Sequence, residues 1–268
     1  MKNERRRKVI FFCVVFFVIV LIIVAHVLSE NNRFRDKYEK FISDSESKPI
    51  LSFTFDDGYY MQYYVVYSLM KEYGFNGTLY MIVNLSSFES RELMNFQQAK
   101  EMQDNGWEIG SHSLSHKNLR ALSGDNLTNE LLLSKLILEE NGLEIHSLAF
   151  PFGYYNETTI NEAEKYYSTL RVINNDYNDL KSVNFLELNS KYIKLDNTPE
   201  EVCSWINYAK ENKKWLILTF HYISNESYRK YDYSAEGLKE ILECARKNKI
   251  DVKTIEQVRE DYEQFRER

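Results

Sequence analysis

Two adjacent carboxylates at the end of an apolar segment are the first feature that could do chemistry. Asp56 and Asp57 follow the apolar run 49–55 directly, and Gly58 closes the motif. Adjacent carboxylates repel each other, and placing both where a buried strand emerges costs free energy that a cation or a catalytic task can offset. An ordinary acidic turn closed by glycine is the alternative for this motif taken alone.

Histidines supply a second set of candidate ligands. His112 and His116 follow the short apolar segment 107–110, and their spacing lets both side chains face one way on a helical turn and bind one metal ion. A pair of exposed or capping histidines is the alternative. His221 follows the most apolar segment of the chain, residues 215–220, where a lone histidine is more often structural.

Taken together, these residues indicate metal-assisted hydrolysis. One carboxylate and two imidazoles form a typical catalytic site for a divalent metal, with positions left open for water and substrate. A second carboxylate and a third histidine then remain for proton transfer. The donor set suits Zn²⁺, with Co²⁺, Ni²⁺ and Mn²⁺ as alternatives.

The elements that must position these residues alternate between strand and helix. Apolar runs rich in β-forming residues predict strands, and segments with helical spacing follow them. The expected strands are 49–55, 78–83, 107–110, 147–150, 192–195, 215–220 and 251–255. This alternation favours a (β/α) barrel or an open α/β sheet, in which residues just past the carboxyl ends of the strands gather at one edge.

The N-terminal segment differs from the rest of the chain. Residues 9–28 are apolar except for His26, and twenty helical residues span ~30 Å, the thickness of a bilayer core. The basic flank 1–8 precedes them, which predicts a transmembrane signal-anchor with the flank in the cytoplasm. A cleaved signal peptide competes with this interpretation, although its apolar core is normally only about 7–15 residues long. A stalk over 29–48 and one domain over 49–268 are expected outside the membrane.

Composition limits the partners. The chain has 268 residues and a formal net charge of -6. An acidic chain repels phosphate backbones, so no nucleic-acid partner is expected. Cys203 and Cys244 lack metal-type spacing, and they could either pair or stay as buried free thiols.

Four motifs in order resemble those of the polysaccharide deacetylase family, also called the NodB-homology or carbohydrate esterase 4 family. They are 54–58 (TFDDG), 112–116 (HSLSH), 150–153 (FPFG) and 218–221 (LTFH). The resemblance implies a distorted (β/α) barrel with fewer than eight strands. It also implies removal of N-acetyl, and sometimes O-acetyl, groups from polymers such as chitin, peptidoglycan, poly-N-acetylglucosamine and xylan.

The resemblance also implies a role for each site residue. Asp57, His112 and His116 would bind the metal, Asp56 would be the general base and His221 the general acid. The turn at 150–153 would bind the oxyanion through the backbone N–H of Phe152, which follows Pro151.

The sequence departs from the family pattern at two places. Many members have an arginine that orients the catalytic aspartate, and Ala149 stands near the position of that arginine. Subgroups that act on poly-N-acetylglucosamine look similar to this chain at the turn, so the difference is interpreted as a mark of such a subgroup. A clear Asp-Trp pair of the fourth motif is missing, and Asp196 is the candidate substitute as the partner of His221.

The predicted protein is therefore a single-pass enzyme of the cell membrane with its catalytic domain on the extracytoplasmic side. It would be a metal-dependent N-deacetylase of polymers that contain N-acetylglucosamine and would act through metal-activated water. An O-acetyl esterase with the same site and a catalytically silent carbohydrate-binding relative are the alternatives.

Overall fold

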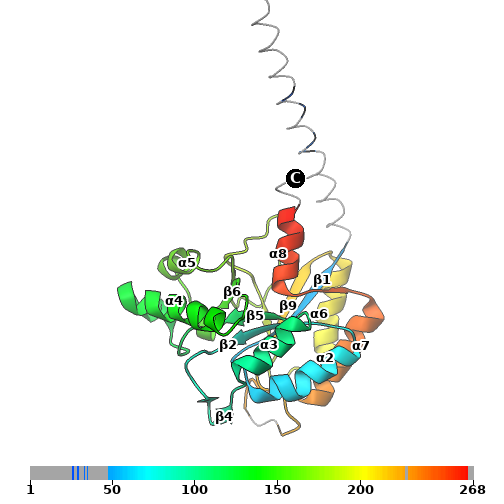
Figure 1. Cartoon of the computed structure of the whole chain (residues 1–268). Coiled ribbons are helices and arrows are strands. Elements are labelled where there is room, and N and C mark those ends of the chain that lie inside the picture. Colours follow the sequence, from blue (N-terminus) through cyan, green and yellow to red (C-terminus); the bar gives the residue numbers. More distant parts are fainter. Residues whose placement is uncertain are drawn as a thin grey trace, which may run out of the picture. The chain divides into compact units, whose positions relative to one another are not determined.

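The computed structural model describes residues 48–226 and 229–264, together with positions 26, 29, 33 and 35 (Figure 1). The predicted basic flank and nearly all of the predicted membrane span and stalk lie outside the described residues. Within the described part of the chain, no helix combines the length and the apolar character that crossing a bilayer requires. Almost all of the described residues fall in one compact unit, Ser45–Tyr262.

A sheet of eight parallel strands forms the centre of this unit. Its order is β7-β6-β5-β2-β1-β9-β8, and β10 pairs with β1. The strands are β1 (Ile50–Phe55), β2 (Thr78–Met81), β5 (Glu108–Ser111), β6 (Ser147–Ala149), β7 (Thr169–Arg171), β8 (Lys191–Tyr192), β9 (Trp215–Phe220) and β10 (Asp251–Val252). The fold is thus an α/β half-barrel of parallel strands, in line with the predicted fold class.

The two longest strands lie side by side and are buried along their whole length. β1 and β9 pair over six positions, from Ile50 beside Trp215 to Phe55 beside Phe220. Continuous apolar runs of this kind are typical of strands covered on both faces. Because both strands end at the same level, Asp56 and His221 leave the sheet next to each other.

Helices follow most strands and cover the sheet. They are the π-helix η1 (Gln62–Tyr67), α2 (Ser68–Glu72), α3 (Phe96–Asp104), α4 (Gly124–Glu140), α5 (Glu157–Ala163), α6 (Pro199–Glu211), α7 (Ala235–Asn248) and α8 (Ile255–Gln264). Helices α6 and α7 both begin at an N-cap residue with a side-chain hydroxyl. Thr198 accepts a hydrogen bond from the N–H of Glu201, and Ser234 accepts one from the N–H of Gly237.

Three local features differ from the sequence-based expectation. Strand β7 was not predicted, and neither was the antiparallel hairpin of β3 (Ser87–Phe88) and β4 (Arg91–Glu92). The last predicted strand, 251–255, ends at Val252, because Ile255 begins helix α8.

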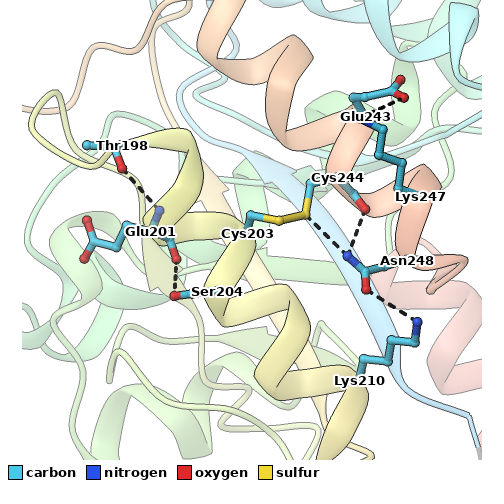
Figure 2. The surroundings of a disulfide bond; sticks show 9 residues. All are labelled: Thr198, Glu201, Cys203, Ser204, Lys210, Glu243, Cys244, Lys247 and Asn248. Carbon is cyan, nitrogen blue, oxygen red and sulfur yellow. Dashed lines mark hydrogen bonds and ion pairs between the residues drawn. A yellow bond between two sulfur atoms is a disulfide. The ribbon is translucent and has the colours of Figure 1, made fainter.

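The disulfide is formed. Cys203 of α6 and Cys244 of α7 are bonded, with their Cα atoms 6.0 Å apart (Figure 2). The two helices pack against each other, and the covalent link joins them across 41 positions of sequence. Of the two alternatives for these cysteines, the structure therefore has the pair.

Candidate active site

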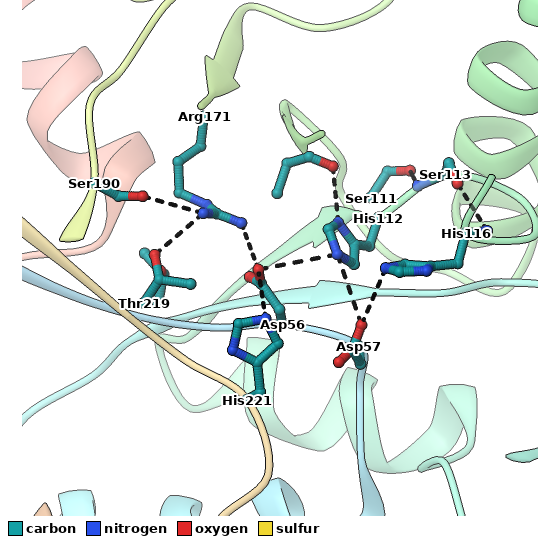
Figure 3. Close-up of polar contacts among 12 residues, drawn as sticks. Asp56, Asp57, Ser111, His112, Ser113, His116, Arg171, Ser190, Thr219 and His221 are labelled. Carbon is teal, nitrogen blue, oxygen red and sulfur yellow. Dashed lines mark hydrogen bonds and ion pairs between the residues drawn. The ribbon is translucent and has the colours of Figure 1, made fainter. Parts of the chain in front are cut away.

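The two carboxylates leave β1 in different directions. Asp57 has a φ of 76° and Gly58 a φ of 79°, so the chain takes two left-handed steps directly after the strand. A non-glycine residue in this region is strained, and such strain is often found at functional sites. The turn directs Asp56 toward Arg171 and His221, and Asp57 toward the imidazoles of His112 and His116 (Figure 3).

The imidazoles converge on Asp57. The Nε2 atoms of His112 and His116 lie 3.7 Å and 3.5 Å from Oδ1 of Asp57. His112 Nδ1 lies 2.8 Å from the carbonyl oxygen of Ala149. Because a carbonyl only accepts hydrogen bonds, Nδ1 must carry the proton and Nε2 presents its lone pair to the site.

The segment that carries the two histidines is a loop, and the expected helical turn is wrong. Strand β5 ends at Ser111, and both Ser113 and His116 are left-handed, with φ of 66° and 58°. The Oγ atom of Ser113 accepts a hydrogen bond from the N–H of His116. Two left-handed residues bend the chain back on itself, which brings both imidazoles to one side without helical periodicity.

A buried glutamate of α4 supports this loop. The Glu130 carboxylate accepts hydrogen bonds from the N–H of Ser115 at 2.9 Å and from its hydroxyl at 2.6 Å. It also pairs with Lys117 at 2.9 Å. The bond to the N–H of Ser115 fixes the backbone directly before His116.

The chemistry of the three residues fits a divalent metal ion. Their ligand atoms all lie within 4.8 Å of one another. Burial lowers the pKa of His112 to about 4 and that of His116 to about 3, so both imidazoles are neutral at neutral pH. Burial and the charge of Asp56 raise the pKa of Asp57 well above its ordinary value, and its Oδ1 atom has no hydrogen-bond partner among the described residues. Electron-pair donors that face one another in this way are stabilised by a shared cation.

A buried arginine holds the other carboxylate. Arg171 donates from Nη2 to Oδ2 of Asp56 at 2.6 Å, and from Nη1 to Ser190 and Thr219 at 3.2 Å and 3.1 Å. Burial acts to raise the pKa of Asp56, but the guanidinium outweighs it, together with His112 and His221, so the pKa is lowered. Asp56 is therefore ionised although it is almost completely buried.

Sequence reasoning missed Arg171. In the sheet it lies directly beside Ala149, the position at which the expected arginine is absent. The guanidinium thus comes from the neighbouring strand, β7, and not from the strand that precedes the Pro151 turn. The signal was the run 169–173 (TLRVI), whose β-forming residues flank one arginine.

His221 faces Asp56 from the end of β9. Its Nε2 atom lies 3.8 Å from Oδ2 of Asp56, and its ring packs against those of Tyr192 and Tyr231, with centroid separations of 5.2 Å and 5.3 Å. Burial lowers the pKa of His221. Its Nδ1 atom has no hydrogen-bond partner in the described part of the chain. The suggested bond from Asp196 is not formed: Asp196 is exposed, and β8 presents Tyr192 to the imidazole instead.

A cleft of about 360 Å³ opens over these residues. Aromatic and charged side chains line it: Asp57, Tyr59, Phe88, Glu89, Arg91, His112, His116, Phe152, Tyr154, Tyr192, His221, Arg229, Lys230, Tyr231 and Asp232. The rings of Phe88 and Phe152 flank His116 at centroid separations of 4.5 Å and 4.6 Å. The β3–β4 hairpin is fixed to one wall by Arg91, which binds both carboxylate oxygens of Asp232 at 2.7 Å and 2.6 Å.

The predicted oxyanion turn borders this cleft. Pro151 is buried and begins the 3₁₀ turn η3 (Pro151–Gly153). Phe152 is left-handed, with a φ of 61°, and half exposed to the cleft. The turn therefore lies next to the proposed metal ligands, as expected.

Comparisons with known proteins agree with this geometry. The sequence model of the polysaccharide deacetylase family matches residues 43–170. The Bacillus subtilis protein YxkH, provisionally named a polysaccharide deacetylase, is 32% identical over 120 residues, which are 44% of this chain and 42% of YxkH. The match thus spans less than half the length of that curated relative.

Solved structures extend the similarity. The Streptococcus pyogenes deacetylase PplD, solved with acetate, is 29% identical over 56% of this chain and 67% of its own, with a TM-score of 0.51. A mutant of a carbohydrate esterase 4 pseudoenzyme with restored activity shares the fold over 79% of this chain and 67% of its own, at 16% identity and a TM-score of 0.54. Residues 43–170 therefore match the polysaccharide deacetylase domain, of the NodB-homology or carbohydrate esterase 4 type, and the similarity to solved structures extends beyond this range.

Proposed function

We propose that this chain is a metal-dependent polysaccharide N-deacetylase that acts on polymers containing N-acetylglucosamine. The observation that carries the proposal is the convergence of Asp57, His112 and His116 on one point, with Asp56 and His221 on the adjoining side. Binding of a carbohydrate alone requires neither an ionised buried carboxylate nor a histidine opposite it. The arrangement therefore supports catalysis over a silent carbohydrate-binding role.

Asp57, His112 and His116 are the residues that would hold the metal ion, with Zn²⁺ as the natural choice for this donor set. When bound, the ion would lower the pKa of a water molecule and polarise the acetyl carbonyl. Asp56 would accept the proton of the attacking water, a general-base contribution of typically 10²–10⁴-fold. Arg171 would keep Asp56 ionised and oriented. It would take the role of the arginine that many family members have near the position of Ala149.

The other residues would act on the acyl group and on the leaving group. The backbone N–H of Phe152 would donate a hydrogen bond to the developing oxyanion, a contribution of about 3 kcal/mol in comparable sites. His221 would protonate the amide nitrogen, because an amine cannot leave as an anion. The carbon–nitrogen bond then breaks, and acetate and a free amine on the sugar result.

An O-acetyl esterase is the second candidate, and one observation favours it. The imidazole of His221 has a lowered pKa and no acidic partner at Nδ1 among the described residues. At neutral pH a proton donor of this kind is protonated in a smaller fraction of molecules than an ordinary histidine is. An ester needs such a donor less than an amide does, because an alkoxide leaves more readily than an amide anion.

We also propose that the domain works outside the cytoplasm, anchored by residues 9–28. Disulfides persist in oxidising compartments, and the bond between Cys203 and Cys244 supports this location. The proposed substrates are polymers of the cell surface.

Acetate release by the full chain tests the proposed function. The substrates are chitin oligomers, poly-N-acetylglucosamine, peptidoglycan and O-acetylated xylan, each with and without a chelator. We expect release from an N-acetylated polymer that stops with the chelator and returns when Zn²⁺ is added. Release that the chelator leaves unchanged would contradict the proposal. Release from the xylan alone would favour the esterase, and the His221→Ala variant should then lose little activity.

A further inference from the structure

A buried glutamine connects the backbone at the proposed base to the backbone at the proposed acid. Gln62 is the first residue of the π-helix η1, and its side chain is completely buried. Its Nε2 atom lies 2.6 Å from the carbonyl oxygen of Asp56 and 2.8 Å from the carbonyl oxygen of His221. Helices of this wider type are rare and are frequently found at functional sites.

The hydrogen-bond chemistry fixes the orientation of this amide. An amide nitrogen carries two hydrogens, and the two backbone carbonyls accept one each. The reversed amide would place Oε1 against two carbonyl oxygens, which are also acceptors. Gln62 therefore donates both hydrogens, one to each of the two segments.

These bonds lie where the sheet comes to an end. β1 and β9 end at Phe55 and Phe220, and the N–H of Asp56 still donates to the carbonyl of Phe220 at 2.9 Å. One step further, the backbone turns away toward the cleft on both strands. There the side chain of Gln62 joins the two segments that a further ladder bond would otherwise join.

We propose that Gln62 is a positioning residue that sets the distance between the carboxylate of Asp56 and the imidazole of His221. This inference rests on the proposed function, because it needs these two groups to act as base and acid. Gln62 does not line the cleft and acts only through the backbone of its two partners. Reacting groups displaced by 1 Å can lose on the order of 10²-fold in rate, so a link at this point affects turnover.

The test compares an amide with an ester substrate in the Gln62→Met variant, which keeps the side-chain length and removes both donors. With the acid displaced, we expect kcat on an N-acetylated glucosamine oligomer to fall on the order of 10- to 100-fold. The fall on an O-acetylated sugar should be clearly smaller, because ester cleavage depends less on His221. KM should not change, because Gln62 does not line the cleft.

Asn178→Leu is the matched control. Asn178 is also a buried amide, and its side chain donates to the carbonyl of Asn189 at 2.8 Å. It contacts the backbone of Trp215, at the opposite end of β9 from His221. This variant should lower thermal stability without changing the ratio of amide to ester turnover. An equal fall of Gln62→Met on both substrates, or no fall at all, would overturn the inference.

A shorter variant covers the case in which Gln62→Met does not fold. Gln62→Asn keeps the amide but lacks one methylene, so it can reach only one of the two carbonyls. We expect the same bias against the amide substrate, and an unchanged ratio overturns the inference. A wild-type chain that releases acetate from neither substrate overturns the proposed function itself, whereas an active wild-type chain with unbiased variants overturns only the role of Gln62.

Discussion

At the scale of single residues, the charge of Arg171 determines the protonation state of Asp56. Burial alone would raise the pKa of this carboxylate, and the guanidinium at 2.6 Å reverses the shift. In Arg171→Met, Asp56 should therefore hold its proton to higher pH and fail as a base. We expect kcat to fall by about 10²-fold or more, with the acid limb of the pH–rate profile displaced upward.

Arg171→Lys separates charge from geometry in the same experiment. Lysine keeps the positive charge but cannot bind Asp56, Ser190 and Thr219 with one planar group. This variant should retain the wild-type acid limb with a reduced kcat. A profile of Arg171→Met that coincides with that of the wild type would contradict the role given to Arg171.

Arg171 shows why part of the site could not be predicted from the sequence. The motifs placed Asp56, Asp57, His112, His116 and His221 at the ends of strands, and the structure brings all five together. Arg171 belongs to no motif. Its link to the site depends on the register of β7 against β6, which local sequence does not specify.

At the scale of elements, helix α4 holds the loop that presents His116. Removal of the Glu130 carboxylate would release the backbone and the hydroxyl of Ser115, which lies between the left-handed residues Ser113 and His116. We expect Glu130→Ala to weaken zinc binding by about 10- to 100-fold, as calorimetry on the metal-free protein would show.

Glu140→Ala is the control on the same helix, because Glu140 is exposed at its last turn. Equal zinc affinity in the two variants would show that the loop keeps its shape without Glu130. The loop also marks a limit of sequence reasoning. A spacing of four residues is shared by a helical turn and by a loop with two left-handed residues, and only the backbone angles distinguish them.

At the scale of the whole molecule, a buried carboxylate outside the candidate site lies at the start of strand β5. Glu108 accepts hydrogen bonds from Ser147 at 2.6 Å, from Thr78 at 2.9 Å and from the N–H of Glu256 in the first turn of α8 at 2.8 Å. Burial raises its pKa from the ordinary value of 4.5 to about 7. The folded chain therefore binds this proton more tightly than the unfolded chain does.

The sign of the resulting pH dependence follows from linkage. The contribution of Glu108 to stability is complete below about pH 4 and falls as the pH rises toward 7, by about 3 kcal/mol in total. Glu108→Gln should remove this dependence. In denaturant titrations, the free energy of unfolding of the variant should therefore gain on the wild type between pH 5 and pH 8. A difference between the two proteins that stays constant with pH would contradict this.

The overall fold was more predictable than its details. The alternation of strands and helices predicted parallel strands, and long apolar runs such as 215–220 gave their bounds correctly. Strand β7 was missed because Arg171 interrupts its β-forming run. The β3–β4 hairpin was missed because each of its strands is two residues long and carries exposed or charged side chains. Such short strands are held by pairing with their neighbours and not by a pattern of their own.

The zinc content of two variants at adjacent positions tests whether Asp57 binds the metal ion and Asp56 acts as the base. After metal removal and reloading, zinc per chain is measured in Asp56→Asn and Asp57→Ala beside the wild type, together with acetate release. We expect Asp56→Asn to bind zinc as the wild type does but to release no acetate, and Asp57→Ala to lose both. A zinc content in Asp57→Ala equal to that of the wild type would contradict the assignment of Asp57 as a metal ligand.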